Sequence, residues 1–288
     1  MEKLKQSRLA SFIIIFLIYA AAFLVGVCVY SSLATVFPSE MWRLFIADVA
    51  ATVFVWFWGL VFKNVSVYDP YWSVLPPVLV TAWFVQCGSF GVAQCLLLVA
   101  VGVWAIRLTA NWAITFRNLN AEDWRYTKYR TEQKPFLFHI INFFGLNMMP
   151  TVLVFLCVLP GLYIIDHVCS ANLLTWLGFF VCIGAATIQL VADTQIHRFV
   201  REHKGEVCNV GLWKHGRHPN YFGEISMWWG VWIMFVSMFG FSVNAWYVVC
   251  PILMTCLFLF ISIPLMEKRQ LKNKPQYAEY KKQTRILI

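Results

Sequence analysis

The sequence predicts an all-α, polytopic membrane protein: a bundle of about eight transmembrane helices with both termini in the cytosol. Three observations predict this fold. The 288 residues are 60% hydrophobic and only 13% charged, whereas about a quarter of the residues in soluble domains are charged. Several apolar runs reach the roughly 20 residues that a helix needs to cross a bilayer. Basic residues are concentrated in alternate connections between those runs.

Apolar runs define the predicted spans. The first follows the basic tail MEKLKQSR and continues to Tyr30, which is too long for the apolar region of a cleavable signal peptide. The third is short and contains Pro76 and Pro77, so its signal is the weakest. The fifth carries Pro150 and Pro160, which predict kinks. The spans are predicted at 9–30, 44–62, 73–89, 91–116, 138–165, 171–195, 221–240 and 245–266.

Lysine and arginine residues predict the orientation. If the spans alternate, 21 of the 23 basic side chains lie on one side, in the two tails and in the connections 63–72, 117–135 and 196–219. The other side has Arg43, and Arg107 falls within a span. Short loops rich in Lys and Arg stay cytoplasmic, so a polar ligand should bind from the cytosol. The same topology accounts for the net charge of +9 without a nucleic-acid partner. The default membrane is the endoplasmic reticulum in a eukaryote and the inner membrane in a bacterium.

The densest polar chemistry lies between residues 193 and 224, in DTQIHRFVREHKGEVCNVGLWKHGRHPNYFGE. Pro219 favours the first turn of a helix, so the following span would present unpaired N–H groups and a positive dipole end to the cytosol. Such helix ends bind anions, and Arg217 adds positive charge. Asn220 and Glu224 are four residues apart and share a helix face. This region therefore predicts a site for a phosphate-bearing ligand.

Some of these charges have a simpler explanation. Cationic loops beside a membrane are a consequence of topology and are satisfied by anionic headgroups, and this explanation is preferred for Arg198, Lys204 and Lys214. An acid inside a span is costly and is by default a functional candidate, which applies to Glu224 and to Asp193. Asp193 has the alternative of a helix-end ion pair with Arg198.

Two further intramembrane charges, Asp48 and Arg107, are explained equally well by function or by pairing with each other. Metal binding is not expected. Four of the six histidines fall at 197–218, but His215 and His218, spaced i, i+3, are followed by Pro219 and are not expected to be helical. The nine cysteines contain no C-x-x-C pair, and no G-x-G-x-x-G or P-loop occurs. A nucleotide would therefore bind among helix ends.

Longer motifs resemble a known superfamily. GLWKHGRHPNYFGEISMWWG at 211–230 and IPLMEKRQLKNKPQYAEYKKQTR at 263–285 resemble the steroid 5-alpha-reductase C-terminal superfamily. Within it, YDPYWS at 68–73, NLNAEDWRY at 118–126 and DTQIHRF at 193–199 resemble the branch of membrane proteins known as DUF1295. The resemblance implies a helical membrane fold that binds NADPH at the cytoplasmic ends of its C-terminal helices. Related reductases deliver hydride to a polarised carbon–carbon double bond in a sterol- or polyprenyl-like lipid.

The resemblance also implies roles for individual residues. Asp193 matches an aspartate on the cofactor, and Asn220 and Glu224 match an N-x-x-x-E pair at its nicotinamide end. The other predicted cofactor-binding residues are Arg201, Arg217, His218, Tyr221, Arg269, Tyr277 and Tyr280. Accordingly, 136–288 is predicted to be the reductase-like transmembrane domain with the cofactor site. Residues 1–135 form the N-terminal transmembrane region and a possible substrate side, and the substrate would enter from the bilayer.

The residues that polarise the substrate are less evident, because the N-terminal half does not match the Glu and Tyr that steroid reductases use. Asp69 and Tyr71, in YDPYW, are the predicted catalytic residues. NAEDWRY offers Glu122, Asp123 and Tyr126. For every one of these side chains, anchoring at the membrane interface or a solvated loop position is the alternative.

Two other functions compete with the predicted NADPH-dependent lipid reductase. Methyltransferases of the isoprenylcysteine type carry a similar R-H-P-x-Y-x-G motif, and Glu267 would then face the amine of S-adenosylmethionine. The loop is more basic than a cationic cofactor requires, and Asp193 and Glu224 match the reductases better, so the reductase is preferred. The other alternative is a non-catalytic lipid-binding membrane protein, because fold does not guarantee chemistry.

Overall fold

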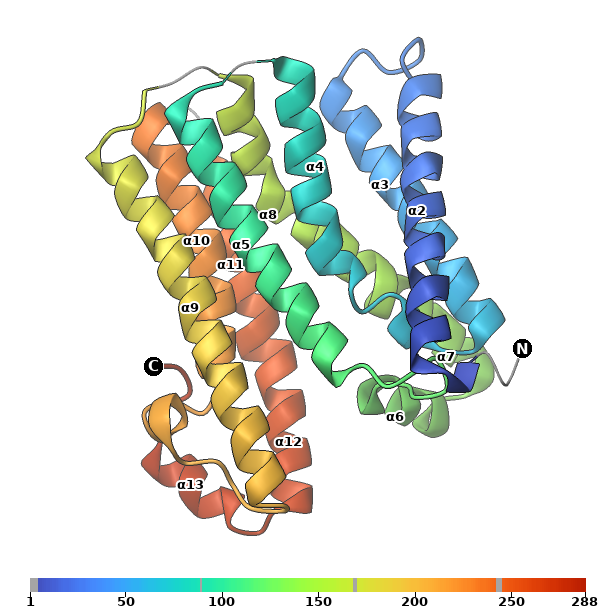
Figure 1. The fold of residues 1–288 in the computed structure, drawn as a ribbon, viewed down its shortest axis with the longest axis vertical. Helices are drawn as coiled ribbons and strands as arrows, with labels where there is room; N and C mark the ends of the chain where they lie inside the picture. The colour runs from blue at the N-terminus through green and yellow to red at the C-terminus, as the bar shows by residue number, and fades with distance from the viewer. Residues whose placement is uncertain (1–4, 89, 168–169, 242–244) are drawn as a thin grey trace. The chain divides into compact units, whose positions relative to one another are not determined.

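The computed structural model of the chain describes residues 5–88, 90–167, 170–241 and 245–288. Over these ranges the protein is almost entirely helical (Figure 1), and the single strand-like pairing is a bridge between Gly216 and Arg285. The predicted all-α class is confirmed.

The protein is an integral membrane protein. Within the described residues, seven helices are long and apolar enough to cross a bilayer, and they match seven of the eight predicted spans. The remaining predicted span, the third in chain order at 73–89, corresponds to α4 (Tyr71–Cys87). The 17 residues of α4 lie at the short end of the range for crossing a bilayer, about 17–25 residues. The seven helices are Arg8–Ser32, Glu40–Phe62, Val92–Thr115, Pro135–Asp166, Leu173–Glu202, Pro219–Phe239 and Trp246–Asn273.

Residue contacts group the chain into two compact units. The first comprises Met1–Pro76 and Thr109–Leu156. In it, α2 (Arg8–Ser32) packs against α3 (Glu40–Phe62). A short 3-10 turn, Val65–Val67, follows α3, and α6 (Trp124–Glu132) precedes α7 (Pro135–Ile140).

The helix that begins with α7 is wider where a kink was predicted. A π-helical segment, Ile141–Met148, joins α7 to α8 (Met149–Asp166), so the widened turns come directly before Pro150. Proline removes one backbone donor, and local π turns with side-chain hydrogen bonds are the usual accommodation in membrane helices. Here the Asn147 Nδ2 donates to the Asn142 carbonyl oxygen at 2.7 Å. The helix also continues through Pro160.

The second unit comprises Pro77–Leu108 and Cys157–Ile288. It contains most of α5 (Val92–Thr115) together with the C-terminal helices, so residues of α5 lie among them. The functional division predicted at residue 135 stays a prediction. The C-terminal helices are α9 (Leu173–Glu202), α10 (Pro219–Phe239), α11 (Val249–Cys256), a π-helical segment (Leu257–Ser262), α12 (Ile263–Asn273) and α13 (Tyr277–Gln283).

Helices α9 and α10 pack closely along their length in opposite directions (Figure 1). Small residues allow the close approach: a Cβ added to Gly178 would lie 2.8 Å from the Gly230 oxygen, and one added to Gly223 would lie 2.7 Å from the Ala185 oxygen. Backbone atoms cannot move aside as a flexible side chain can. The register of the two helices, and of the side chains between them, is therefore fixed.

Candidate functional site

Three helices of the second unit each contribute two polar side chains, spaced one turn apart. We call these six residues the polar core. Five of them are buried, and Asn220 is partly buried. They are Trp104 and Arg107 on α5, Gln189 and Asp193 on α9, and Asn220 and Glu224 on α10. Spacings of three and four residues place each pair on one helix face, so the polar core has two layers.

The layer nearer to the basic loop (203–218) is built around Asp193. The Arg107 Nη1 donates to Asp193 Oδ2 at 2.8 Å, and the Asn220 Nδ2 donates to Asp193 Oδ1 at 3.3 Å. The ion pair is buried, with 7% of the Arg107 side chain and 10% of the Asp193 side chain exposed. Asp193 and Asn220, both predicted from sequence as cofactor residues, are thus brought together.

Two alternatives weighed for these charges were wrong. Arg107 pairs with Asp193, and not with Asp48. Arg198 does not pair with Asp193 either, because its Nε donates to Glu202 at 3.2 Å at the exposed end of α9. The reason is geometric: Asp193 points between α5 and α10, whereas Arg198 lies five residues further along α9 and is exposed.

The inner layer is built around Glu224, which is 4% exposed. Its Oε2 accepts from the Trp104 Nε1 at 2.9 Å and from the Gln189 Nε2 at 2.7 Å. Its Oε1 accepts from the Trp228 Nε1 at 3.2 Å. Three neutral donors thus hold an acid within an apolar helix, and the Arg107 guanidinium lies within electrostatic reach. Such an arrangement satisfies a buried carboxyl group that would otherwise be very costly in a membrane.

A second group, which includes the predicted residues Arg217 and His218, ties the C-terminal tail to the start of α10, which begins at Pro219 as predicted. We call Arg217, His218, Glu267 and Lys281 the C-terminal latch. Glu267 accepts from the Arg217 Nε at 2.7 Å, from the Lys281 Nζ at 2.6 Å, and from the His218 Nε2 at 3.3 Å.

Arg217 also binds the backbone of the tail. Its Nη1 donates to the carbonyl oxygens of Lys281, at 3.0 Å, and of Thr284. Its backbone N–H donates to the Arg285 oxygen at 2.9 Å. Next to it, a Cβ on Gly216 would lie 2.9 Å from the Ile288 nitrogen. Arg217 is therefore buried and bonded to protein groups, and it is not displayed on the surface.

His218 is neutral at pH 7. Burial lowers the pKa of the imidazole to about 4, although its hydrogen bond to Glu267 acts in the opposite direction. The contact with Glu267 is therefore a hydrogen bond donated by a neutral ring to the carboxylate, and not an ion pair. The ring stacks on Tyr221 with centroids 5.3 Å apart and planes 5° apart, and Tyr221 in turn lies against Phe258 at 4.8 Å.

The tail tyrosines are anchoring groups in this arrangement. Tyr280 donates from its hydroxyl to the Trp213 carbonyl oxygen at 2.5 Å and packs against Tyr277. Burial raises the pKa of Tyr277 to about 12, so it stays protonated. Of the two remaining predicted residues, Arg201 is exposed at the end of α9 and Arg269 is half-buried on α12. Over the described ranges, no group of three or more His, Cys, Asp or Glu side chains gathers as metal ligands would.

The predicted catalytic residues, Tyr71 and Asp69, belong to the first unit and have different partners. The Tyr71 hydroxyl donates to Asp48 Oδ1 at 2.9 Å, while Asp69 Oδ1 accepts from the Tyr126 hydroxyl at 2.5 Å. Burial raises the pKa of Asp69 to about 6, against the opposing effect of Arg125. Asp48 is 2% exposed and is the partner that the sequence did not indicate for Tyr71.

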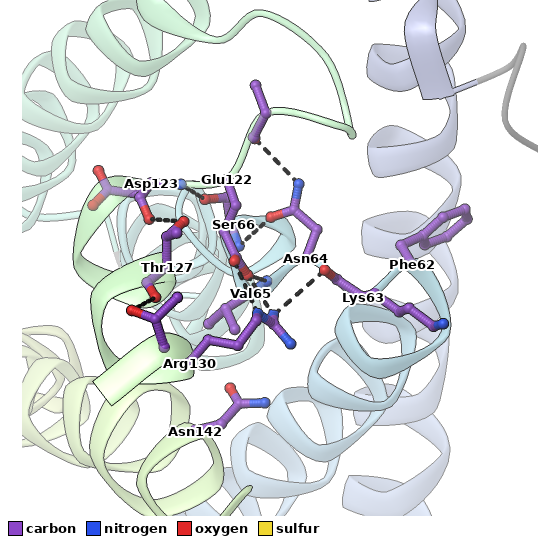
Figure 2. Close-up of polar contacts among 12 residues, drawn as sticks. Phe62, Lys63, Asn64, Val65, Ser66, Glu122, Asp123, Thr127, Arg130 and Asn142 are labelled. Carbon is purple, nitrogen blue, oxygen red and sulfur yellow. Dashed lines mark hydrogen bonds and ion pairs between the residues drawn. The ribbon is translucent and has the colours of Figure 1, made fainter. Parts of the chain in front are cut away.

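The NAEDWRY motif has an architectural role, shown in Figure 2. Glu122 Oε1 accepts from the Val65 backbone N–H at 2.9 Å and from the Arg130 Nη2 at 2.7 Å. The Asp123 backbone N–H donates to the Ser66 hydroxyl oxygen at 2.9 Å. These bonds hold the turn after α3 against the segment that begins α6. Glu122 and Asp123 thus stabilise the turn after α3 and the segment before α6.

Sequence reasoning missed part of the polar core and one of its neighbours. Trp104 and Gln189 of the polar core and the adjacent Trp228 all bind Glu224, yet none was singled out. Arg107 was considered either as a functional residue or as a partner of Asp48, and not as a partner of Asp193. A usable signal existed for Gln189, which lies four residues before Asp193 and hence on the same face of α9. The tryptophans carried no such signal, because Trp is also common at membrane interfaces.

Comparison with family models matches residues 55–284 to a family described as "Protein of unknown function (DUF1295)". The matched segment contains the whole polar core and the C-terminal latch, as well as Asp69 and Tyr71. No match was found among curated proteins or among solved structures.

Proposed function

Because this integral membrane protein belongs to the DUF1295 family and buries two acids within a network of amide, indole and guanidinium donors, we propose that it is an NADPH-dependent reductase of a double bond in a hydrophobic lipid. The observation that carries the proposal is the environment of Glu224, bonded at 2.7 Å to Gln189 and at 2.9 Å to Trp104. Polar groups kept inside a membrane helix at such cost are usually functional.

The residues of the second unit fit a dinucleotide at both of its ends. The basic loop and the end of α9 carry exposed Arg201, Lys204 and Lys214, which suit the phosphate groups. The polar core lies within the helices α5, α9 and α10 and suits a polar ring that must be shielded from lipid. Two buried atoms of the polar core, Gln189 Oε1 and Arg107 Nε, have no hydrogen-bond partner among the described residues. A nicotinamide group would satisfy such atoms.

In this proposal Asp193, Asn220 and Glu224 belong to the part of the site that receives the nicotinamide end, and the cofactor when bound supplies the hydride. Arg201, the exposed predicted cofactor residue at the end of α9, contacts the phosphates directly. Arg217 acts differently, as a positioning residue, because its guanidinium already bonds to Glu267 and to the tail. Its part is to hold the tail against the start of α10.

For the substrate we propose Tyr71 as the polarising hydroxyl, oriented by Asp48, within the first unit. The Tyr71 hydroxyl has a single hydrogen, which it donates to Asp48 in this structure, so in this proposal it turns that hydrogen from Asp48 to the substrate when the substrate binds. Asp69 stays a predicted catalytic residue: a pKa of about 6 lets it exchange a proton near neutral pH. The substrate class, a sterol-, steroid- or polyprenyl-like lipid, follows from the resemblance and from a site built in a membrane protein.

The methyltransferase alternative needs a free Glu267 to face the amine of S-adenosylmethionine. Glu267 instead accepts from Arg217, Lys281 and His218, so its charge is already balanced by two cations. The two acids of the polar core face one arginine, which would suit a sulfonium cation as well as an oxidised nicotinamide. Ligand binding therefore decides between the two functions.

The test uses the full-length protein purified into lipid nanodiscs. NADPH and S-adenosylhomocysteine are titrated separately, and NADPH oxidation is then followed by its fluorescence after addition of a total lipid extract. We expect NADPH to bind and to be consumed. Glu224→Gln and Arg217→Ala should abolish NADPH binding while membrane insertion is kept, and Thr187→Val, an exposed change on α9, should bind like the wild type.

Three outcomes would count against the proposal. Binding of S-adenosylhomocysteine in place of NADPH would favour the methyltransferase. Binding of neither ligand would favour a non-catalytic lipid-binding protein. Unchanged NADPH affinity in both Glu224→Gln and Arg217→Ala would place the cofactor elsewhere.

A further inference from the structure

Two buried atoms of the polar core have unused hydrogen-bonding capacity. Gln189 Oε1 is an acceptor, and Arg107 Nε carries a donor hydrogen. Neither has a hydrogen-bond partner among the residues that the structure describes. Gln189 is fully buried and Arg107 is 9% exposed. Buried polar side-chain atoms are hydrogen-bonded in the large majority of cases, and an exception calls for an explanation.

Neighbouring residues fix the orientation of both side chains. The Gln189 Nε2 donates to Glu224 at 2.7 Å, so the nitrogen of the amide faces the carboxylate and the oxygen faces away. A Cβ on Gly223 would lie 2.4 Å from Gln189 Cγ, so the Gln189 side chain is packed tightly against α10. The Arg107 Nη1 is held by Asp193 at 2.8 Å, and the Nε hydrogen is left for another acceptor.

A single ligand group that satisfies both atoms must have both a donor and an acceptor. The two atoms belong to adjacent layers of the polar core, which are separated by about one helical turn, roughly 5.4 Å. A phosphate or carboxylate supplies acceptors only and would leave Gln189 Oε1 unpaired, and an ammonium group would leave Arg107 Nε unpaired. A primary carboxamide has an N–H donor on one side and a carbonyl acceptor on the other, and hydrogen bonds of about 2.9 Å allow it to bridge the two layers.

We infer that Gln189 and Arg107 are the residues that recognise the carboxamide of the nicotinamide ring. Gln189 Oε1 accepts from the carboxamide NH₂ group, and Arg107 Nε donates to the carboxamide oxygen. Asp193 and Glu224 then act indirectly: Asp193 fixes the Arg107 guanidinium, and Glu224 fixes the Gln189 amide. This inference rests on the proposed function, and it makes ring recognition depend on two residues outside the RHPNYFGE motif.

Modified cofactors test each hydrogen bond separately. The 3-acetylpyridine analogue of NADP⁺ has a methyl group in place of NH₂, and the thionicotinamide analogue has sulfur in place of the carbonyl oxygen. Adenosine 2′,5′-bisphosphate keeps the adenosine and phosphate groups and lacks the ring. Because either analogue leaves one buried group unpaired, we expect the wild type to bind it about ten- to a hundredfold more weakly than NADP⁺.

Two variants remove the complementary protein groups. Gln189→Met keeps the length of the side chain and removes the acceptor. Arg107→Lys keeps the positive charge beside Asp193 and removes Nε. In Gln189→Met the preference for NADP⁺ over the acetylpyridine analogue should disappear, while the preference over the thio analogue persists. Arg107→Lys should show the reverse pattern. This is a double-mutant cycle between protein and ligand.

Adenosine 2′,5′-bisphosphate distinguishes the possible failures. Both variants and the control Thr187→Val should bind it within about twofold of the wild type, which shows that they are folded. If the wild type binds it and NADP⁺, yet binds the acetylpyridine analogue as tightly as NADP⁺, the carboxamide assignment is overturned and the reductase proposal stands. If each variant keeps the discrimination of the wild type, the assignment is likewise overturned. If the wild type binds neither NADP⁺ nor the bisphosphate, the proposed function fails and the inference fails with it.

Discussion

Arg217 and Glu267 form a buried ion pair, with the Arg217 Nε 2.7 Å from Glu267 Oε1 and only 6% and 7% of the two side chains exposed. The pair joins the residue two positions before α10 to the middle of α12. Because Arg217 also binds two tail carbonyls, one guanidinium holds three segments of the chain together. The Arg217 guanidinium therefore has a structural role in the protein without a ligand.

Replacing Arg217 by alanine should therefore destabilise the protein as well as impair ligand binding. Loss of one partner of a buried ion pair leaves the other charge poorly compensated and costs about 3–5 kcal/mol. We expect a marked fall in the thermal unfolding temperature in detergent, and faster proteolysis of the tail after α13.

Arg198→Ala is the matched control. Arg198 pairs with Glu202 four residues along the same helix, with 80% of its side chain exposed, and such surface pairs contribute less than about 1 kcal/mol. If Arg217→Ala and Arg198→Ala unfold at the same temperature with equally resistant tails, the latch has no structural role.

Acidification should weaken the protein through His218. Burial keeps the pKa of the folded imidazole at about 4, below the usual value of about 6.5. Between these values the unfolded chain binds a proton that the folded protein does not. The contribution of His218 to the free energy of unfolding is therefore fully present above about pH 6.5 and is lost as the pH falls toward 4. The full effect is roughly 3 kcal/mol. His218→Gln, which does not titrate, should lose less stability between pH 7 and 4, as measured by chemical unfolding at each pH. Parallel pH curves for the two proteins would contradict the prediction.

The contribution of Asp69 to stability should depend on pH in the opposite direction and decrease as the pH rises. Burial raises the pKa of its folded carboxyl to about 6, above the usual value near 3.9. The folded protein then holds a proton that the unfolded chain releases, so the contribution is complete below about pH 3.9 and is lost as the pH rises through 6. Asp69→Asn should be more stable relative to the wild type at pH 8 than at pH 4, by roughly 3 kcal/mol.

The variant keeps an acceptor oxygen for the Tyr126 hydroxyl, so the hydrogen bond itself survives. Glu132→Gln, which lies at an exposed position of α6, serves as a control and should change little at either pH. If the difference in stability between Asp69→Asn and the wild type is the same at pH 8 and at pH 4, ionisation of Asp69 does not destabilise the folded protein.

Local features of the sequence were sufficient to predict most of the fold. Apolar length identified the membrane helices, and Pro219 located the first turn of α10, because both signals depend only on neighbouring residues. The shared face of Asn220 and Glu224 followed from helix periodicity, and both side chains do point to partners on α9.

Pairings between helices could not be predicted in the same way. Asp48 was considered as a partner for Arg107, and Arg198 as a partner for Asp193, whereas Arg107 and Asp193 pair with each other. That choice depends on which helices pack together in the folded unit. The same limit applies to Tyr71, whose partner is Asp48 and not the neighbouring Asp69. Hydropathy and spacing describe one helix at a time, so they identify charged residues without identifying their contacts.

The close packing of α9 and α10 gives a last prediction that links the fold to the site. At Gly223 an added Cβ would lie 2.7 Å from the Ala185 backbone oxygen and 2.4 Å from Gln189 Cγ, whereas at Gly184 an added Cβ meets nothing within 4 Å. Gly223→Ala should therefore push the helices apart at a cost of about 1–3 kcal/mol and displace Gln189, so that NADP⁺ affinity falls together with the unfolding temperature. Gly184→Ala places the same methyl group on the open side of α9. It should be neutral or stabilising by up to about 1 kcal/mol, because alanine favours helix more than glycine does. Thermal unfolding and NADP⁺ titration of the two variants provide the check. A Gly223→Ala protein as stable as Gly184→Ala would mean that α9 and α10 do not approach as closely as described, and that the position of Gln189 against Glu224 is not fixed by this contact.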